Sequence, residues 1–419
     1  MIGPRQASSA GRRTGTANTR AGGGAWFRWF VVLGTSLLAL GACTSNSDDE
    51  DASESSTTAE APPATIVSDG DAPAALQEEL EAALADVMAR FEVPGAVVAV
   101  DTPEGSWTAE AGVADLESGA PASGEAVWPL RSLTKSIVVT ALLQLADEGA
   151  LGLDDPISSY VEGVPNGDEI TLRQLADMSS GVGDYTQSEA FIDAFVADPS
   201  HQFTLEELNE YGLAEGAQFP PGTDRVYSNT ATNVLGVVIE SVTGQPIAEV
   251  VQARILDPLG MEQTTYPASD NDWPEPHAQG YQPGDDGLEP AFNSFSGMGA
   301  SGAMISTLED MAVWAEALGT GSLISAERHA ERLMGSPLSE GPEYDLYAVG
   351  IGEVEGWWGH TGEGLGFTSL AMYDPASGST VVVFMNISQA VGEGADGEPE
   401  QRHAPTVLMR EFAPILAAA

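Results

Sequence analysis

The chain of 419 residues carries 63 Asp and Glu against 15 Lys and Arg, which gives a formal net charge of −48 at pH 7. Because so acidic a surface repels the phosphate backbone, the composition argues against a nucleic-acid partner. Cys43 is the only cysteine, which excludes an intramolecular disulfide, and the five histidines show no ligand-like spacing, so we expect no metal and no cofactor.

The first 42 residues are typical of an export signal. They contain five arginines and no acidic residue, and end in an apolar run that is short for a membrane span but suits a signal-peptide core. Leu40-Gly41-Ala42 directly before Cys43 resembles a bacterial lipobox. We therefore predict a lipoprotein signal peptide over residues 1–42, and an exported cell-envelope lipoprotein anchored at the outer face of the cytoplasmic membrane by a lipid on Cys43. A conventional cleaved signal or an uncleaved anchor is the alternative, and the export route stays open.

Residues 43–72 differ from the rest of the chain in composition. They consist largely of Ser, Thr, Ala, Pro and acidic residues, with almost no large apolar side chain to bury. Such a segment cannot offset the entropy of folding, so we predict a disordered acidic tether. Residues 73–419 are long enough for a large core and form the predicted folded domain.

The predicted elements alternate in character along this domain. Hydrophobic spacing predicts a helix over 73–91, a hairpin of strands 96–100 and 106–111, a helix after residue 132, helices near 171–178, 205–213, 231–243 and 246–257, a helix over 308–318, strands 367–373 and 380–385, and a closing helix near 404–417. We predict an α/β (α+β) fold, with an antiparallel sheet built from both termini and flanked by helices. An all-helical subdomain is inserted over roughly 150–300, and the active-site cleft is expected between the two.

A serine and a lysine open the predicted helix after residue 132. Ser132 and Lys135 are three residues apart, which puts hydroxyl and amine on one face, and Lys135 is the only lysine in the chain. Residues 136–146 are apolar nearly all round, so the helix should be buried. Burying an ammonium costs several kcal/mol unless partners stabilise it, so a chemical role is favoured over a chance spacing.

Two later stretches could face the same cleft. Tyr227-Ser228-Asn229 precedes the predicted helix 231–243, and His360-Thr361-Gly362 leads towards the strand at 367. Each has an ordinary structural interpretation on its own, as a chance triplet or as a histidine at a strand end.

In this order and spacing, the three motifs resemble those of the penicillin-recognising serine hydrolases. The likeness spans roughly residues 80–415 and is greatest to secreted DD-carboxypeptidases, class C β-lactamases and related esterases. The resemblance implies that Ser132 attacks an acyl carbonyl while Lys135 and Tyr227 share its proton, with a Tyr227 phenolate as a possible base. It also implies an oxyanion hole of the Ser132 and Glu363 backbone N–H groups, a substrate-binding strand with His360, Thr361 and Gly362, and Asn229 holding Lys135 or the substrate amide.

The resemblance predicts a serine hydrolase that acts through an acyl-enzyme on a peptide, amide, β-lactam or ester. The nearest type is a D-alanyl-D-alanine carboxypeptidase, and a carboxylesterase or a class C-like β-lactamase is the alternative. A non-catalytic surface lipoprotein that binds a ligand with the same fold is the rival class. The expected partners are a small-molecule or peptidoglycan-peptide substrate and the membrane, and we expect a monomer.

One departure bears on the substrate. The carboxypeptidase branch is expected to hold a terminal carboxylate with an arginine before the His-Thr-Gly strand, yet no basic residue lies between Arg332 and Arg402. Glu353, Glu355 and Glu363 instead add negative charge there. Uncharged esters or amides should therefore outrank free carboxylates, unless Arg131 or Arg225 supplies the contact. Met178 stands where the family has a histidine before Ser179-Ser180-Gly181.

Overall fold

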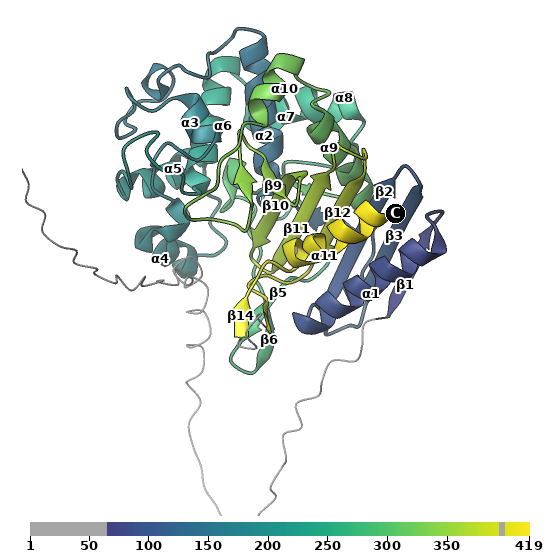
Figure 1. Ribbon diagram of the computed structural model, residues 1–419. Coiled ribbons are helices and arrows are strands. Elements are labelled where there is room, and N and C mark those ends of the chain that lie inside the picture. The colour runs from purple at the N-terminus through teal and green to yellow at the C-terminus, as the bar shows by residue number, and fades with distance from the viewer. Residues whose placement is uncertain (1–64, 394–398) are drawn as a thin grey trace, which may run out of the picture.

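The computed structural model describes residues 65–393 and 399–419. Cys43 and the predicted signal peptide lie outside the described residues. Eight strands form one antiparallel sheet in the order β1-β3-β2-β12-β11-β10-β9-β8 (Figure 1). These strands are β1 Ile66–Gly70, β2 Gly95–Thr102, β3 Gly105–Gly112, β8 Leu346–Tyr347, β9 Gly352–Val354, β10 Trp357–Gly364, β11 Phe367–Tyr373 and β12 Thr380–Met385. The predicted antiparallel sheet, with strands from both ends of the chain, is confirmed.

The central strands are apolar on both faces because both faces are covered. Along β2, Val97 and Ala99 belong to one hydrophobic core, whereas Ala96, Val98 and Val100 belong to the other. Successive side chains of a strand point to opposite faces, so an unbroken apolar run is what a sheet between two helical layers requires. The sequence run of alanines and valines thus specifies a central strand.

Helices from distant parts of the chain cover the two faces. Helices α1 (Ala74–Arg90) and α11 (Ala404–Ala418) pack on each other and on one face, across the near side of the sheet in Figure 1. Helices α2 (Leu133–Asp147) and α9 (Leu308–Thr320) pack on the other face. Helix α2 is buried nearly all round, as its composition predicts, and Gly149 beyond its end has a positive φ of 73° that a residue without a side chain adopts easily.

The region between α2 and α9 is mainly helical. It contains α3 Leu172–Ala176, α4 Glu189–Ala197, α5 Leu205–Ala214, α6 Asn229–Thr243, α7 Ile247–Val251 and α8 Asp257–Leu259, and α10 Ala326–Arg332 follows α9. The expectation of an all-helical insert is wrong, because β5 (Tyr281–Gly284) and β6 (Gly287–Pro290) form a hairpin within it. The strands are joined by Gly284-Asp285-Asp286-Gly287, residue types that are common in loops as well as in turns between two strands.

The start of the folded domain also differs from the prediction. Residues Ile66–Gly70 form the edge strand β1, paired with β3, inside the segment predicted as a tether. Only one apolar side chain of β1 is even half-buried, so the strand leaves little signal in composition. Short pairs were missed as well: β4 (Trp128–Pro129) with β7 (Ile305–Ser306), and β13 (Val391–Glu393) with β14 (Pro399–Gln401).

No single helix in the part of the chain that the structure describes is long and apolar enough to cross a membrane. Two consecutive segments reach the necessary length and apolar character only when they are taken together, and the chain bends by 79° between them: Asn229–Thr243 and Ile247–Leu259.

Candidate active site

Ser132 and Lys135 lie where α2 begins. Ser132 is the residue before the first helical residue, and Lys135 Nζ is 2.9 Å from Ser132 Oγ. The Lys135 side chain is fully buried, while Ser132 lines a cavity of about 220 Å³, which we call the catalytic cleft. The predicted hydroxyl–amine pair is therefore formed, with the hydroxyl facing the cleft and the amine behind it.

The surroundings of Lys135 are compatible with a neutral amine. Nζ is 2.7 Å from Asn229 Oδ1 and 2.8 Å from the carbonyl oxygen of Ser301, which are acceptors only. A neutral amine donates its two hydrogens to these oxygens and leaves its lone pair for the Ser132 hydroxyl. Burial lowers the pKa of Lys135 to about 7, against the opposing charge of Asp184. Lys135 is therefore suited to accept the proton of Ser132 near neutral pH.

Asp184 is a site residue that the sequence analysis missed. It is buried, and its Oδ2 accepts a hydrogen bond of 3.0 Å from Asn229 Nδ2. That bond orients the amide so that Oδ1 faces Lys135, which is one of the two roles expected for Asn229. Burial raises the pKa of Asp184, while the Lys135 charge and hydrogen bonds lower it. No motif spacing marks Asp184, and a search for an acid shortly after Ser179-Ser180-Gly181 is the one signal that could have found it.

Tyr227 also lines the catalytic cleft, before α6. Its ring centroid lies 5.0 Å from Lys135 Nζ. Burial raises the pKa of Tyr227 well above its ordinary value, and the neighbouring Tyr347 and Tyr344 raise it further. This raised pKa argues against the expected phenolate base, because burial favours the protonated phenol. The base assigned by the geometry is Lys135, and Tyr227 is a neutral hydroxyl beside the nucleophile.

His360 lies inside β10 and is fully buried, instead of preceding a strand. Its Nδ1 is 2.6 Å from the carbonyl oxygen of Thr361 and its Nε2 is 3.1 Å from Tyr347 Oη. A hydrogen on Nδ1 and a free Nε2 satisfy both contacts, so the ring is neutral. Burial and the Lys135 charge lower the pKa of His360 to about 3. His360 does not line the catalytic cleft, so the expected contact with substrate is replaced by a role in holding β10 and Tyr347.

The strand β10 runs directly beside the nucleophile. A side chain at Gly362 would collide with the carbonyl oxygen of Leu130 and approach Arg131 Cβ to 2.9 Å, so only glycine allows this contact. Thr361, Gly362 and Glu363 line the cleft as predicted. Ser132 and Glu363, whose backbone N–H groups form the predicted oxyanion hole, line the same cleft.

The two arginines considered as carboxylate anchors are both engaged elsewhere. Arg131 is fully buried, and its Nη2 donates to Asn293 Oδ1 at 2.6 Å and to the Leu365 carbonyl oxygen at 3.2 Å. Arg225 pairs with Asp177 at 3.2 Å and does not line the cleft. Arg131 lines the cleft, and its Nε and Nη1 have no hydrogen-bond partner among the described residues, but the whole side chain is buried. Neither arginine therefore exposes its guanidinium in the cleft.

Two of the three glutamates expected near the cleft lie away from it. Glu355 pairs with Arg410 at 2.7 Å, and the Glu353 carboxylate accepts the backbone N–H of Gly356. Glu363 does line the cleft, where its carboxylate accepts the Gln389 backbone N–H at 2.8 Å and burial raises its pKa to about 7. Met178 has a structural role, since its sulfur lies 3.4 Å from the Ser228 backbone nitrogen.

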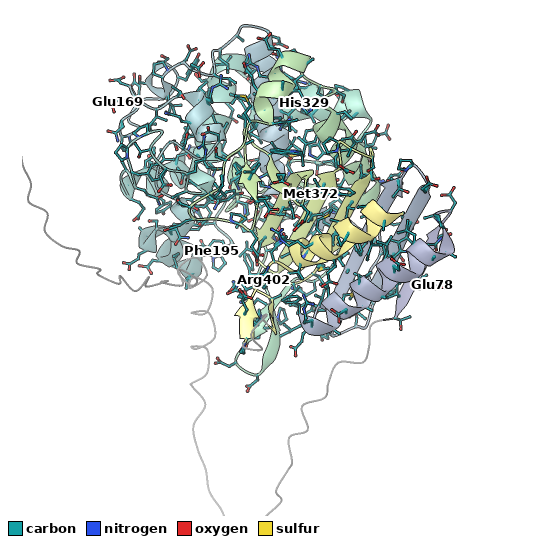
Figure 2. The ribbon with its side chains drawn as sticks, in the orientation of Figure 1. Glu78, Glu169, Phe195, His329, Met372 and Arg402 are labelled. Carbon is teal, nitrogen blue, oxygen red and sulfur yellow. The ribbon has the colours of Figure 1, made fainter. Side chains whose placement is uncertain are left out.

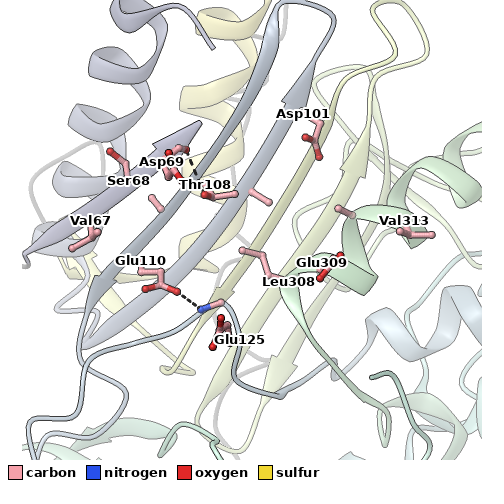
Figure 3. A pocket seen from close by; sticks show the side chains of 14 residues that line it. Val67, Ser68, Asp69, Asp101, Thr108, Glu110, Glu125, Leu308, Glu309 and Val313 are labelled. Carbon is pink, nitrogen blue, oxygen red and sulfur yellow. Dashed lines mark hydrogen bonds between the residues drawn. The ribbon is translucent and has the colours of Figure 1, made fainter. Parts of the chain in front are cut away.

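A second, larger cavity lies apart from these groups. It has a volume of about 520 Å³ and is formed by β1, β2 and β3 together with α9, and we call it the sheet-edge groove (Figure 3). Its floor is apolar, with Leu308 and Val313, and its rim carries the carboxylates of Asp69, Asp101, Glu110, Glu125 and Glu309. It contains none of the motif residues.

Comparison with known proteins agrees with this geometry. The family model described as Beta-lactamase matches residues 80–405. Esterase EstB of Burkholderia gladioli is 29% identical over 294 residues, which cover 64% of this chain and 73% of the esterase. The D-alanyl-D-alanine-carboxypeptidase/endopeptidase AmpH of Escherichia coli K12 is 28% identical over 214 residues, which cover 50% of this chain and 53% of AmpH.

Solved structures extend the likeness to the whole domain. The D-stereospecific amidohydrolase from Streptomyces sp. superposes with a TM-score of 0.66 at 30% identity, over 81% of this chain and 98% of the amidohydrolase. The expectation of the penicillin-recognising superfamily and its fold is confirmed. The chain belongs to the Beta-lactamase family and is a serine hydrolase of the β-lactamase and penicillin-binding type.

Proposed function

We propose that the protein hydrolyses uncharged esters or amides through an acyl-enzyme on Ser132. The observation that carries the proposal is the set of three contacts around Lys135 Nζ: Ser132 Oγ at 2.9 Å, Asn229 Oδ1 at 2.7 Å and the Ser301 carbonyl oxygen at 2.8 Å. Two acceptors occupy both hydrogens of a neutral amine, so its lone pair is aimed at the hydroxyl that must lose a proton.

Each step of the reaction balances with residues of the cleft. Ser132 Oγ bonds to the acyl carbon as its proton passes to Lys135 Nζ, and backbone N–H groups of Ser132 and Glu363 stabilise the oxyanion. The bond to the leaving alkoxide or amine then breaks, and the leaving group takes a proton from Lys135 by way of the Tyr227 hydroxyl. Water attacks the acyl-enzyme in the same manner, which releases the acid and restores Ser132.

The substrate class follows from the polar groups that line the cleft. Arg131 is fully buried, with Nη2 bonded to Asn293, and Arg225 is paired with Asp177 outside the cleft, so neither exposes its guanidinium to a substrate carboxylate in the cleft. EstB is an esterase and the Streptomyces protein is a D-stereospecific amidohydrolase, which supports esters and amides as the substrate classes of this chain. The likeness to AmpH keeps a D-alanyl-D-alanine peptidase as the alternative.

A substrate panel tests the proposal on the purified full-length protein. We expect turnover of p-nitrophenyl butyrate and of a D-amino acid amide, with kcat/KM higher for the methyl ester of a diacyl D-Ala-D-Ala peptide than for the free acid. Ser132→Ala should abolish each activity. Preferred turnover of the free acid or of a chromogenic cephalosporin would replace the proposal with a peptidase or a β-lactamase.

We also propose that Cys43 carries the lipid that anchors the enzyme to the cell envelope. The support is the Leu40-Gly41-Ala42-Cys43 sequence after an apolar run. Expressed in a bacterial envelope, the wild type should sediment with membranes and Cys43→Ser should not. Equal sedimentation of both would refute the lipid anchor.

A further inference from the structure

Arg402 is the arginine of the catalytic cleft whose guanidinium reaches solvent. It follows β14, where Figure 2 labels it, and its side chain is 31% exposed. Nε and Nη2 donate to the two carboxylate oxygens of Glu343 at 2.8 Å and 2.6 Å. This is the two-pronged geometry with which arginine holds a carboxylate, here a carboxylate of the protein itself.

The pair joins the two walls of the cleft. On one side, the loop that contains Gly341 lies against Tyr227. A Cβ atom at Gly341 would lie 2.8 Å from Tyr227 Cβ, and the Tyr227 backbone N–H donates to the Glu340 carbonyl oxygen at 3.0 Å. Glu343 belongs to this loop. On the other side, the residue after Arg402, His403, contacts the carbonyl oxygen of Gly362 at 3.0 Å through Nε2. The guanidinium therefore lies between the hydroxyl side and the oxyanion side of the site.

We infer that Glu343 masks Arg402, and that this ion pair is the specificity filter that makes the cleft reject a substrate carboxylate. The inference rests on the proposed function, because it concerns the substrate of the same nucleophile. The remaining nitrogen, Nη1, is 3.4 Å from the Glu400 carboxylate, so both open sides of the guanidinium already face carboxylates. Arg402 is a carboxylate anchor whose partner is built into the fold.

A substrate carboxylate meets two costs at this pair. It must displace Glu343 from Arg402, and the displaced carboxylate is left half-buried in the cleft that Glu363 also lines. The negative charge of Glu343 already contributes to the raised pKa of Glu363. An uncharged ester or amide leaves the pair intact and avoids both costs. Removing the Glu343 charge should make the Nε and Nη2 side of Arg402 available to a substrate carboxylate, while Glu400 stays beside Nη1.

The test compares matched acid and ester substrates in variants of the pair. The substrates are the p-nitrophenyl monoester of succinate, which carries a free carboxylate, and its methyl ester, which is uncharged. The wild type should favour the uncharged compound in kcat/KM. Glu343→Gln keeps the side-chain size and should raise the acid-to-ester ratio by about tenfold, as expected for one newly available charge-assisted contact. Arg402→Gln should not raise the ratio, and Glu343→Gln combined with Arg402→Gln should cancel the gain.

A binding measurement separates failure of this inference from failure of the proposed function. Phenylboronic acid and 3-carboxyphenylboronic acid both react with an activated serine, and only the second carries a carboxylate. Glu343→Gln should tighten the carboxylated boronate relative to the plain one, with thermal unfolding showing that the variant is folded. If both boronates bind the wild type but Glu343→Gln leaves their ratio unchanged, or if the gain survives in the double variant, the masked anchor is overturned alone. If neither binds, the serine mechanism and the masked anchor are overturned together.

Discussion

The catalytic cleft and the sheet-edge groove are both lined by carboxylates, and they differ in what surrounds those groups. In the cleft, Asp184 is buried and joined through Asn229 to the buried Lys135. In the groove, Asp101, Glu125 and Glu309 stand exposed on the rim of an apolar floor (Figure 3). The groove is the larger cavity, at about 520 Å³ against about 220 Å³.

The comparison shows which property marks the reactive site. Exposed acids are solvated at little cost and are expected in a chain with 63 acidic residues. A buried lysine is tolerated only where its hydrogens meet fixed acceptors, and its burial lowers its pKa to about 7, in the range useful for proton transfer. Burial with satisfied hydrogen bonds, and not cavity size, therefore locates the chemistry.

Among changes in the two regions, replacing Lys135 should cause the largest loss of kcat/KM. Lys135→Met keeps an unbranched side chain in an apolar helix but removes the base, and a positioned acid–base group commonly contributes about 10²–10⁴-fold. We expect kcat/KM for p-nitrophenyl butyrate to fall by that factor, and thermal unfolding should show that the variant is folded although the buried Asp184 loses its opposite charge. A folded variant within threefold of wild-type turnover would place the base elsewhere.

Removing the Tyr227 hydroxyl should have a smaller effect. That oxygen makes no hydrogen bond of normal geometry to any other described residue, so it is free to contact the leaving group. Tyr227→Phe keeps the ring 5.0 Å from Lys135 Nζ and should lower kcat/KM by about 10² for an amide, which needs its leaving group protonated. For a p-nitrophenyl ester, whose leaving group needs no proton, the loss should be much smaller. Equal losses for both substrates would contradict the proton-donor role.

Changes in the sheet-edge groove should have the smallest effect. Asp101→Asn with Glu309→Gln removes two exposed rim charges, and Val313→Ser removes an exposed apolar side chain. We expect kcat/KM within about twofold of wild type, since surface substitutions away from partners change little. A loss beyond tenfold in a folded variant would show that the groove is coupled to the cleft.

The sequence contained most of the fold and the reactive centre. Apolar runs and helical periodicity predicted β2, β11, β12, α1, α2 and α11 close to their observed bounds, because these elements bury whole faces. Ser132, Lys135 and Asn229 came from spacing, and the structure brings them within hydrogen-bond distance. The edge strand β1 and the β5–β6 hairpin were not predicted, because they bury few side chains and their residues are also typical of loops.

Other features of the site depend on contacts that no spacing encodes. The Ser301 carbonyl oxygen contacts Lys135 through the backbone, so residue type gives no hint of it. Asp184 bonds to the side-chain amide of Asn229, which is 45 residues away in the sequence. Glu343 and Arg402, which form an ion pair, are 59 residues apart in the sequence. The burial of His360 between tyrosines reverses the expectation from its motif, because sequence shows neighbours along the chain and not those across the sheet.

The central claim, that neutral Lys135 activates Ser132, is tested most directly by the pH dependence of acylation. A fluorophosphonate is allowed to react between pH 5 and 9, and the modified residue is identified by peptide mass. Because the base is the deprotonated amine and burial lowers the pKa of Lys135 to about 7, the rate should rise roughly tenfold per pH unit below that value and level off above it. Glu363 also has a pKa raised to about 7, so Glu363→Gln should retain the same profile. An adduct on another residue, or a Ser132 rate that is constant or falls as pH rises, would contradict the account.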